Sequence, residues 1–326
     1  MPRRIAYYPS ADSENPYAAL MVQALSAFGQ VERMPRGLDL LRSPWRYCRR
    51  FDLAMFNWLE DVLIDRQGRI RVRGLLEFAA FIIGGRFIAR RIVLVRHNSY
   101  PHACDERRGK RVQGLIDVFE RCFDLSITHS GHNATAHRCY VPHPLYHEPN
   151  EPVQRPEGYF LIFGRIKPYK GIDDVIRAYD DREKRLVIAG PCDDPRYLDA
   201  LRSLAEGKNV QILAGYLAAD DAKQLVGRAD AVVLPHHGRD MIVSGSYFFA
   251  AGLGVPVLAL RMPFLVWASE HLQQPGILFA SSAEALAANA SHVDLPSRRD
   301  IKRAAEENFG RAALEAAYAT LFSRLA

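Results

Sequence analysis

Short apolar runs and longer amphipathic stretches follow one another in a regular order along the chain. In the first half, the apolar runs that predict buried strands lie at residues 5–9, 51–58, 91–98 and 123–130. Residues 15–29 and 72–90 place apolar side chains at helical spacing, and residues 132–138 predict a short helix. Strands that alternate with helices in this way predict a parallel sheet.

The same order restarts after residues 141–158, a stretch with five prolines that predicts a linker. Beyond it, strands are predicted at residues 159–166, 185–190, 210–216, 231–235, 256–260 and 276–280. Helices are predicted between them at residues 171–179, 195–206, 219–228 and 245–253. We therefore expect an α/β chain of two Rossmann-like, doubly wound domains, residues 1–150 and 151–326, that face a cleft. The last helix is a candidate to cross back to the first domain.

Composition narrows the class of protein. The chain has 326 residues, of which 48% are hydrophobic and 25% are charged, as in a globular protein of two domains. The five cysteines show no C-x-x-C spacing, which favours a reducing compartment. The N-terminal sequence lacks the apolar core of a signal peptide, and no run of 18 apolar residues occurs, so we expect a cytoplasmic location.

The positive charge is confined to the first half. The net charge is +6, and residues 1–150 hold 22 lysines plus arginines against 15 aspartates plus glutamates. This asymmetry suggests a polyanionic partner: a nucleic acid, an anionic membrane surface or an acidic glycan. The apolar run at residues 75–83 is followed by Arg86, Arg90 and Arg91, which fits either a membrane-interface helix or a buried domain helix. No RNP, KH or helix-turn-helix signature appears, so we expect no nucleic-acid partner.

The stretch FGRIKPYKGIDD, residues 163–174, joins a predicted strand to a predicted helix. Gly164 permits close approach of the backbone to a ligand, and Arg165 and Lys170 offer a planar fork of donors and a point charge. A strand end, a glycine turn, two cations and a helix start together predict a phosphate site. A solvated basic turn remains the alternative.

A second candidate anion site follows the strand at residues 231–235. Ser244, Gly245 and Ser246 stand where the next helix is predicted to begin. Small residues there leave the backbone N–H groups open to an anion, and hydroxyl groups can donate as well. An ordinary helix cap is the alternative.

Together, these two motifs resemble the donor-site signatures of GT-B glycosyltransferases of the family 4 type. Residues 163–171 contain G-R-I-x-P-Y-K-G, and residues 232–257 begin with V-V-L-P and end with G-V-P-V. The resemblance implies that Arg165 and Lys170 bind the diphosphate of a nucleotide sugar, without a metal or other cofactor. By position alone, it also places Tyr216 at the nucleobase.

The sequence departs from the retaining members of that family, which carry two glutamates in the second signature. No glutamate occurs between Glu206 and Glu270; Phe249 and Asp240 stand nearby instead. In this respect the chain is similar to the β-mannosyltransferases of xanthan-type exopolysaccharide assembly. Their N-terminal half also carries motifs like those at residues 15–17, 58–60 and 97–98. That similarity implies inverting transfer of mannose from GDP-mannose onto a lipid-linked oligosaccharide at the inner face of the membrane.

An inverting transfer needs a general base for the acceptor hydroxyl. The candidates are Asp12 after the first strand, Glu60 after the second and His97 after a further one, with Glu14 and Asp61 as neighbouring alternatives. The resemblance assigns His97 to donor contact first. The histidines at positions 129, 132, 137, 143 and 147 show no metal-ligand spacing, so we interpret them as surface loop residues.

Two other functions keep the same fold. One is a retaining transferase that uses a UDP-sugar, and the other is a nucleotide-sugar epimerase. An epimerase would isomerise the free donor, whereas a transferase would consume it only with an acceptor.

Overall fold

The computed structural model describes residues 3–10, 16–35, 37–65, 67–101, 104–147, 149–236, 241–289 and 296–326. The chain separates into two compact units. The first comprises residues 1–144, 239–243 and 311–326, and the second comprises residues 145–238 and 244–310. The last helix thus packs with the first unit, and the separation falls inside the proline-rich stretch.

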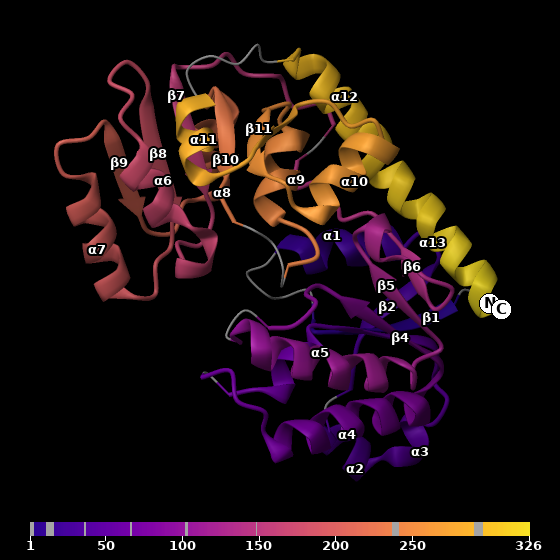
Figure 1. Ribbon diagram of the computed structural model, residues 1–326. Helices are drawn as coiled ribbons and strands as arrows, with labels where there is room; N and C mark the ends of the chain where they lie inside the picture. The colour runs from indigo at the N-terminus through magenta and orange to yellow at the C-terminus, as the bar shows by residue number, and fades with distance from the viewer. Residues whose placement is uncertain are drawn as a thin grey trace. The chain divides into compact units, whose positions relative to one another are not determined.

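The first unit is built on a parallel sheet, which has six strands over the described residues (Figure 1). Their spatial order is β2 (Gly29–Arg33), β1 (Arg3–Tyr8), β3 (Phe51–Asn57), β4 (Ala89–Arg96), β5 (Leu125–Thr128) and β6 (Arg138–Tyr140). The helices of this unit are α1 (Pro16–Leu25), α2 (Gly37–Arg42), α3 (Pro44–Tyr47), α4 (Val72–Ile88), α5 (Glu106–Glu120) and α13 (Arg311–Leu325). Two short 3₁₀ helices, η1 (Leu59–Leu63) and η2 (Gly131–Asn133), follow β3 and β5.

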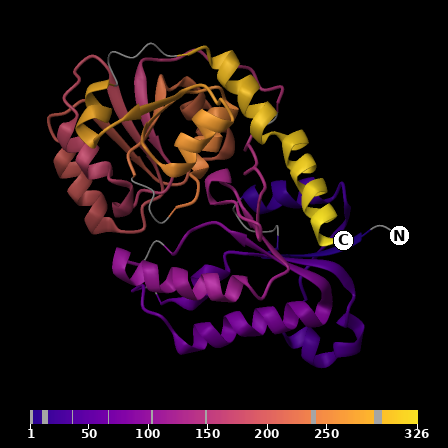
Figure 2. The same ribbon diagram turned by 45° about the vertical axis from the view of Figure 1, so that its right-hand side comes forward.

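Strand β3 shows how the first sheet separates two hydrophobic cores. Leu53 and Met55 belong to the core that includes α1 and α13, whereas Ala54 and Phe56 belong to the core that includes α4 and α5. Successive side chains of a strand point to opposite faces, so a continuous apolar run can serve both cores. Figure 2 shows α4 and α5 together on one face of this sheet.

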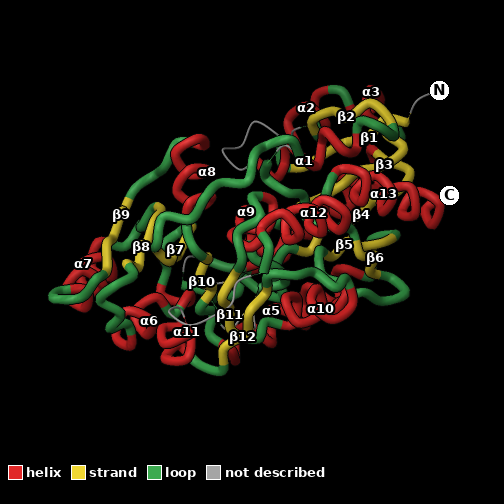
Figure 3. The backbone as a smooth tube through the Cα atoms, turned by 90° about the horizontal axis from the view of Figure 1, so that it is seen from above, coloured by secondary structure: helices red, strands yellow, loops and turns green. Residues whose placement is uncertain are grey.

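The second unit repeats the architecture with a parallel sheet that also has six strands in its described part (Figure 3). The order is β12 (Ile277–Ala280), β11 (Val257–Leu260), β10 (Ala231–Leu234), β7 (Tyr159–Phe163), β8 (Arg185–Gly190) and β9 (Val210–Ala214). Its helices are η3 (Pro168–Lys170), α6 (Ile172–Ala178), α7 (Pro195–Ala205), α8 (Ala219–Arg228), α9 (Gly245–Gly252), α10 (Pro263–His271), α11 (Ala283–Asn289) and α12 (Arg298–Phe309).

The predicted α/β class with two parallel sheets is confirmed. Two strands of the first sheet were not predicted: β2 and β6, which lie at its two edges. The helix predicted at residues 132–138 is wrong, because η2 ends at Asn133 and strand β6 begins at Arg138. Within the described residues, no helix has the length and apolar character needed to cross a bilayer.

Candidate functional site

Three motifs that lie far apart in the first half of the sequence meet around Tyr17, which is 1% exposed. The ring centroid of Tyr17 lies 4.8 Å from that of His97 and 5.3 Å from that of Trp58. The rings of His129 and His143 lie 5.4 and 5.1 Å away. Trp58, His97 and His129 follow the carboxyl ends of β3, β4 and β5, which parallel pairing brings to one edge of the sheet.

Hydrogen bonds determine which ring nitrogen of His129 carries the proton. Its Nδ1 lies 2.8 Å from the carbonyl oxygen of Val141, so Nδ1 must donate. Nε2 is then the acceptor for the hydroxyl of Tyr17 at 2.7 Å. Burial lowers the pKa of His129 to about 4, which keeps this ring neutral at physiological pH.

His97 is a neutral hydrogen-bond donor in the same cluster. Its ring stacks on Trp58 at 4.2 Å, and its Nε2 lies 3.1 Å from Oδ1 of Asn57. The amide nitrogen of Asn57 donates to the carbonyl of Tyr8, so Nε2 of His97 carries the proton. Burial, with smaller contributions from His129 and His143, holds the pKa of His97 well below its ordinary value. A ring with so low a pKa is a weak general base, which favours contact with a substrate as its role.

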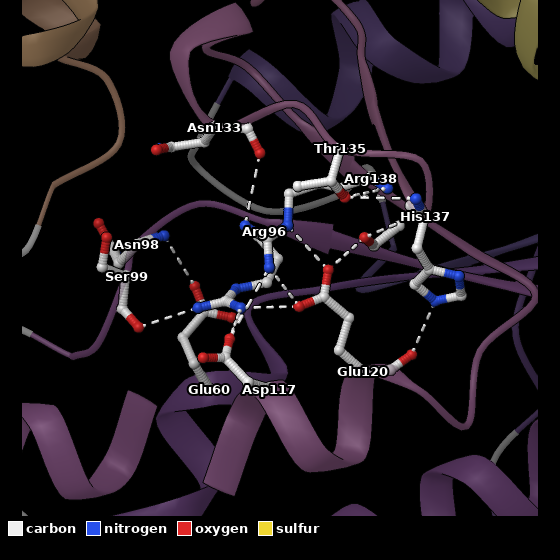
Figure 4. A network of polar contacts seen from close by, with 11 residues as sticks. Glu60, Arg96, Asn98, Ser99, Asp117, Glu120, Asn133, Thr135, His137 and Arg138 are labelled. Atoms are coloured by element: carbon white, nitrogen blue, oxygen red, sulfur yellow. Dashed lines mark hydrogen bonds and ion pairs between the residues drawn. The ribbon is translucent and has the colours of Figure 1, made fainter. Parts of the chain in front are cut away.

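Glu60 is the second residue of η1. This helix begins directly after Trp58, whose φ of 54° turns the chain. Its Oε1 accepts a hydrogen bond of 3.3 Å from the backbone N–H of Asn98 (Figure 4). Glu60 is 3% exposed, and burial raises the pKa of its carboxyl to about 7. A carboxylate with a pKa near the working pH is suited to general acid–base catalysis.

Of the other candidate carboxylates, Asp61 is exposed in η1. Asp12, Glu14 and Asp240 lie outside the described residues.

The interpretation of the histidines as surface loop residues is wrong for three of them. His129, His143 and His147 are buried, whereas His132 is exposed and His137 is half-buried. For His129, the position at the end of the strand predicted at residues 123–130 was an available signal, whereas His143 and His147 lie in the proline-rich stretch without periodicity. Among the described residues, no group of three histidine, cysteine or acidic side chains is arranged to hold a metal ion.

A buried ionic network joins β4, α5 and β6 on the same sheet (Figure 4). Glu120 accepts hydrogen bonds from Arg96 at 2.8 Å and from two nitrogens of Arg138 at 2.8 and 2.5 Å. The hydroxyl of Ser126 donates to the same carboxylate. Although burial opposes its ionisation, the hydrogen bonds from Arg138 and Ser126 lower the pKa of Glu120 to about 2. The network ties edge strand β6 to the sheet, next to His129.

Glu120→Gln should destabilise the protein by about 3 kcal/mol, because the buried Arg96 and the half-buried Arg138 would keep only Asp117, which is 44% exposed, as a carboxylate partner. The native pKa of Glu120 lies below that of the unfolded chain. Its stabilisation is therefore present above about pH 4 and is lost as the pH falls toward 2. Urea unfolding between pH 7 and pH 3 measures both effects. Asp117→Asn, at a carboxylate that is 44% exposed, is the control and should cost less than about 1 kcal/mol. Equal midpoints for the two variants would contradict the buried network.

In the second unit, the glycine turn after β7 brings three predicted residues together. Gly164 has a φ of 104°, which favours glycine. A Cβ atom at Gly164 would lie 3.0 Å from Oγ of Ser246 and 3.1 Å from Nζ of Lys170. Ser246 also donates a hydrogen bond of 2.7 Å to the carbonyl of Phe163. The side of Gly164 on which another residue would carry its Cβ atom is thus bordered by an ammonium group and a hydroxyl group. We call this side the open face of Gly164.

Lys170 is 8% exposed, and no ion pair joins it to any carboxylate of the described residues. Burial lowers the pKa of its ammonium group to about 8. A buried cation without a counter-ion is costly, and an anion that entered beside Gly164 would remove that cost.

Helix α9 begins at this point. Its cap residue, Ser244, is buried, and its side chain makes no capping hydrogen bond. The backbone N–H groups of the first turn therefore receive no acceptor from Ser244. A Cβ atom at Gly245 would lie 3.2 Å from the hydroxyl of Tyr146. The start of α9 thus lies beside Gly164, whose other neighbour is Lys170, and an anion site at residues 244–246 stays a prediction.

Arg165 and Tyr216 are exposed, whereas Lys170 is buried. Arg165 is exposed and pairs with Asp193 at 3.4 Å, and Lys167 pairs with the same carboxylate at 2.7 Å. Tyr216 follows the end of β9 and is 78% exposed. Arg165 is thus available at the surface of the turn, with part of its charge already balanced.

Two residues of this site, Gly190 and Tyr146, were not predicted from the sequence. Gly190 ends β8 with a φ of 141°, and a Cβ atom there would lie 2.3 Å from the carbonyl oxygen of Gly164. The glycine that ends the apolar run at residues 185–190 was the available signal. Tyr146 gave no signal, because it lies in the proline-rich stretch.

Residues 157–294 match the family model described as glycosyl transferases group 1. No curated protein matches the sequence.

Solved structures of similar fold cover the whole chain. HepE from Anabaena, in complex with UDP and glucose, has a TM-score of 0.68 at 15% identity, over 98% of this chain and 99% of that chain. A sucrose-phosphate synthase from Thermosynechococcus elongatus has a TM-score of 0.69 at 13% identity, over 99% of each chain. The lipopolysaccharide outer core galactosyltransferase WaaB, in its apo form, has a TM-score of 0.61 at 15% identity, over 98% of this chain and 99% of that chain. Residues 157–294 of the second unit thus resemble a glycosyl transferases group 1 domain, and the chain has the fold of GT-B glycosyltransferases.

Proposed function

We propose that the protein transfers a hexose from a nucleotide sugar whose diphosphate binds at Gly164, Lys170 and the start of α9. The observation that carries this proposal is the ammonium group of Lys170, which is buried beside the open face of Gly164 with no carboxylate partner among the described residues. During transfer, negative charge develops on the leaving diphosphate. A fixed cation and backbone N–H groups in a desolvated site stabilise that charge.

The donor that we propose is GDP-mannose, and the reaction proceeds with inversion. On α9, Phe249 stands near the position where retaining relatives carry their second glutamate. Its ring packs against Phe163 at 4.9 Å and His147 at 4.3 Å, which makes this face apolar. An inverting displacement forms the new bond as the diphosphate leaves. It requires one base, for which we propose Glu60, and no nucleophile of the enzyme.

A retaining transferase that uses a UDP-sugar is the second candidate. HepE was solved with UDP and with UDP-glucose, which favours uridine as the base. A nucleotide-sugar epimerase is the third. Incubation with the donor alone separates it from the others, because only an epimerase would isomerise free donor.

The acceptor that we propose is a lipid-linked oligosaccharide of exopolysaccharide or cell-surface glycan synthesis, reached at the inner face of the membrane. The arginine-rich first half of the chain supports this location. We expect no metal ion to take part, because Lys170 already supplies a cation at the diphosphate site.

A thermal-shift screen of nucleoside diphosphates tests the proposal. At about a hundredfold excess over Kd, the preferred nucleotide should stabilise the protein by about 2.7 kcal/mol. For a chain of 326 residues, that corresponds to a rise in Tm of about 4 °C. The shift should be larger for GDP than for UDP, and EDTA should leave it unchanged. A larger shift with UDP would favour the second candidate, and no shift with any nucleotide would contradict a nucleotide-sugar transferase.

A further inference from the structure

The amino-terminal edge of the first sheet holds a cavity of about 750 Å³. Four arginines line it, Arg3, Arg49, Arg90 and Arg91, together with a single acidic side chain, Asp52. The cavity lies where β1, β3 and β4 begin, at the opposite edge from Glu60 and His97. None of its residues belongs to the candidate catalytic cluster.

Most of the positive charge in this cavity is not balanced. The side chains of Arg49 and Arg90 make no hydrogen bond or ion pair within the described part of the chain, and Arg91 shares Asp124 with Arg86. Asp52 accepts a hydrogen bond of 2.9 Å from the backbone N–H of Arg4. Guanidinium groups that converge in excess of the neighbouring carboxylates favour an anion with several acceptor oxygens, such as a phosphate group.

An exposed apolar stripe runs along α4 beside this cavity. Its residues follow one another at intervals of three or four, so they share one helical face: Val72, Leu76, Ala80, Ile83 and Phe87. Val72 is 75% exposed and Ile83 is 70% exposed. An apolar face of four helical turns whose side chains stay exposed within the described residues indicates a contact surface.

Helices α2 and α3 extend the stripe with two further exposed apolar side chains, Leu41 and Trp45. Leu40 of α2 and Phe81 of α4 line the same apolar hollow. The backbone N–H of Arg49, just after α3, donates to the carbonyl of Phe87 at 2.9 Å. Figure 1 shows the three helices together at the same end of the first unit.

We propose that this face docks onto an anionic phospholipid membrane, with the arginine cavity receiving the phosphate of a lipid headgroup. Tryptophan and aliphatic side chains of α2, α3 and α4 would enter the headgroup region, and the arginines at the end of α4 would contact phosphate. The inference deepens the proposed function, on which it rests for a lipid-linked acceptor. Because the docking face and Glu60 lie at different parts of the unit, docking does not block the catalytic cluster.

Co-sedimentation with vesicles tests the proposal with the full chain. The wild type should bind vesicles of phosphatidylcholine with phosphatidylglycerol and should not bind vesicles of phosphatidylcholine alone. The double variant R49Q/R90Q should bind about thirtyfold more weakly, since each arginine near an anionic surface contributes about fivefold. The double variant W45S/I83S should weaken binding about tenfold or more, through loss of apolar contact.

The control is R196Q/R202Q on α7, which removes the same charge from exposed positions of the second unit and should bind like the wild type. Wild-type affinity of R49Q/R90Q, or an equal loss in the control, would overturn the proposal. It would also be overturned if inorganic phosphate, at the concentration of lipid phosphate, displaced the protein, since the site would then serve a soluble anion. The GDP-induced thermal shift of R49Q/R90Q should equal that of the wild type, so failure of docking is distinguishable from failure of the donor site.

Discussion

Replacing Lys170 with methionine should lower the affinity for the nucleoside diphosphate about a hundredfold to a thousandfold. Removing one partner of a desolvated charge pair costs about 3–4 kcal/mol, because the bound diphosphate is left without its counter-charge. Methionine has nearly the same length as lysine, and it buries no charge. The unliganded variant should therefore be at least as stable as the wild type. Calorimetric titration gives the affinity, and the Tm gives the stability.

Lys167→Met is the matched control for this experiment. Lys167 lies three residues earlier in the same turn, but it pairs with Asp193 at 2.7 Å, so its loss should change the affinity much less. Equal losses in the two variants would show that the whole turn attracts the ligand, and normal binding by Lys170→Met would refute the diphosphate site.

The titration of Lys170 should make both the stability of the protein and its diphosphate affinity depend on pH. Its native pKa of about 8 lies below that of lysine in the unfolded chain, about 10.4. The unfolded chain thus binds more protons in this window. The stability of the unliganded protein should rise as the pH increases from about 8 toward 10. Diphosphate affinity should fall in the same range, and both trends should be absent in Lys170→Met.

Replacing Glu60 with glutamine should lower kcat by about a hundredfold to ten-thousandfold while leaving donor binding unchanged, because a general base contributes that much. The amide oxygen of glutamine can still accept the hydrogen bond from Asn98, so the fold should be kept. In the wild type, kcat/KM should rise with pH through about 7, as the carboxyl loses its proton. Transfer of labelled sugar to a polyprenyl-diphosphate-linked acceptor measures both.

The neighbouring variant Asp61→Asn removes the same charge from an exposed position and should retain activity. If Glu60→Gln were as active as the wild type, the assignment of the base would be wrong. Asp12 would then be the next carboxylate to test, ahead of the weakly basic His97.

Periodicity alone was enough to predict the central strands. Residues 53–56 and 231–235 are apolar throughout, because helices cover both faces of a central parallel strand. Edge strands β2 and β6 were missed because they lack such a run: β2, GQVER, has no buried residue, and β6 has only Cys139. Their pairing depends on neighbouring strands that the local sequence does not contain.

The sequence by itself determined the two α/β units and the chemistry of the turn at residues 163–171, because strand periodicity and a glycine between cations are local properties. Only the tertiary structure decided that Lys170 is buried, with no counter-ion in the part of the chain that the structure describes, while Arg165 is exposed beside Asp193. It also decided that the rings of Trp58, His97 and His129 pack around Tyr17. Burial of Glu60, which raises the pKa of its carboxyl to about 7, was likewise decided there. The physical reason is that burial, charge pairing and pKa depend on neighbours far away in sequence, which parallel strands bring to one edge of a sheet.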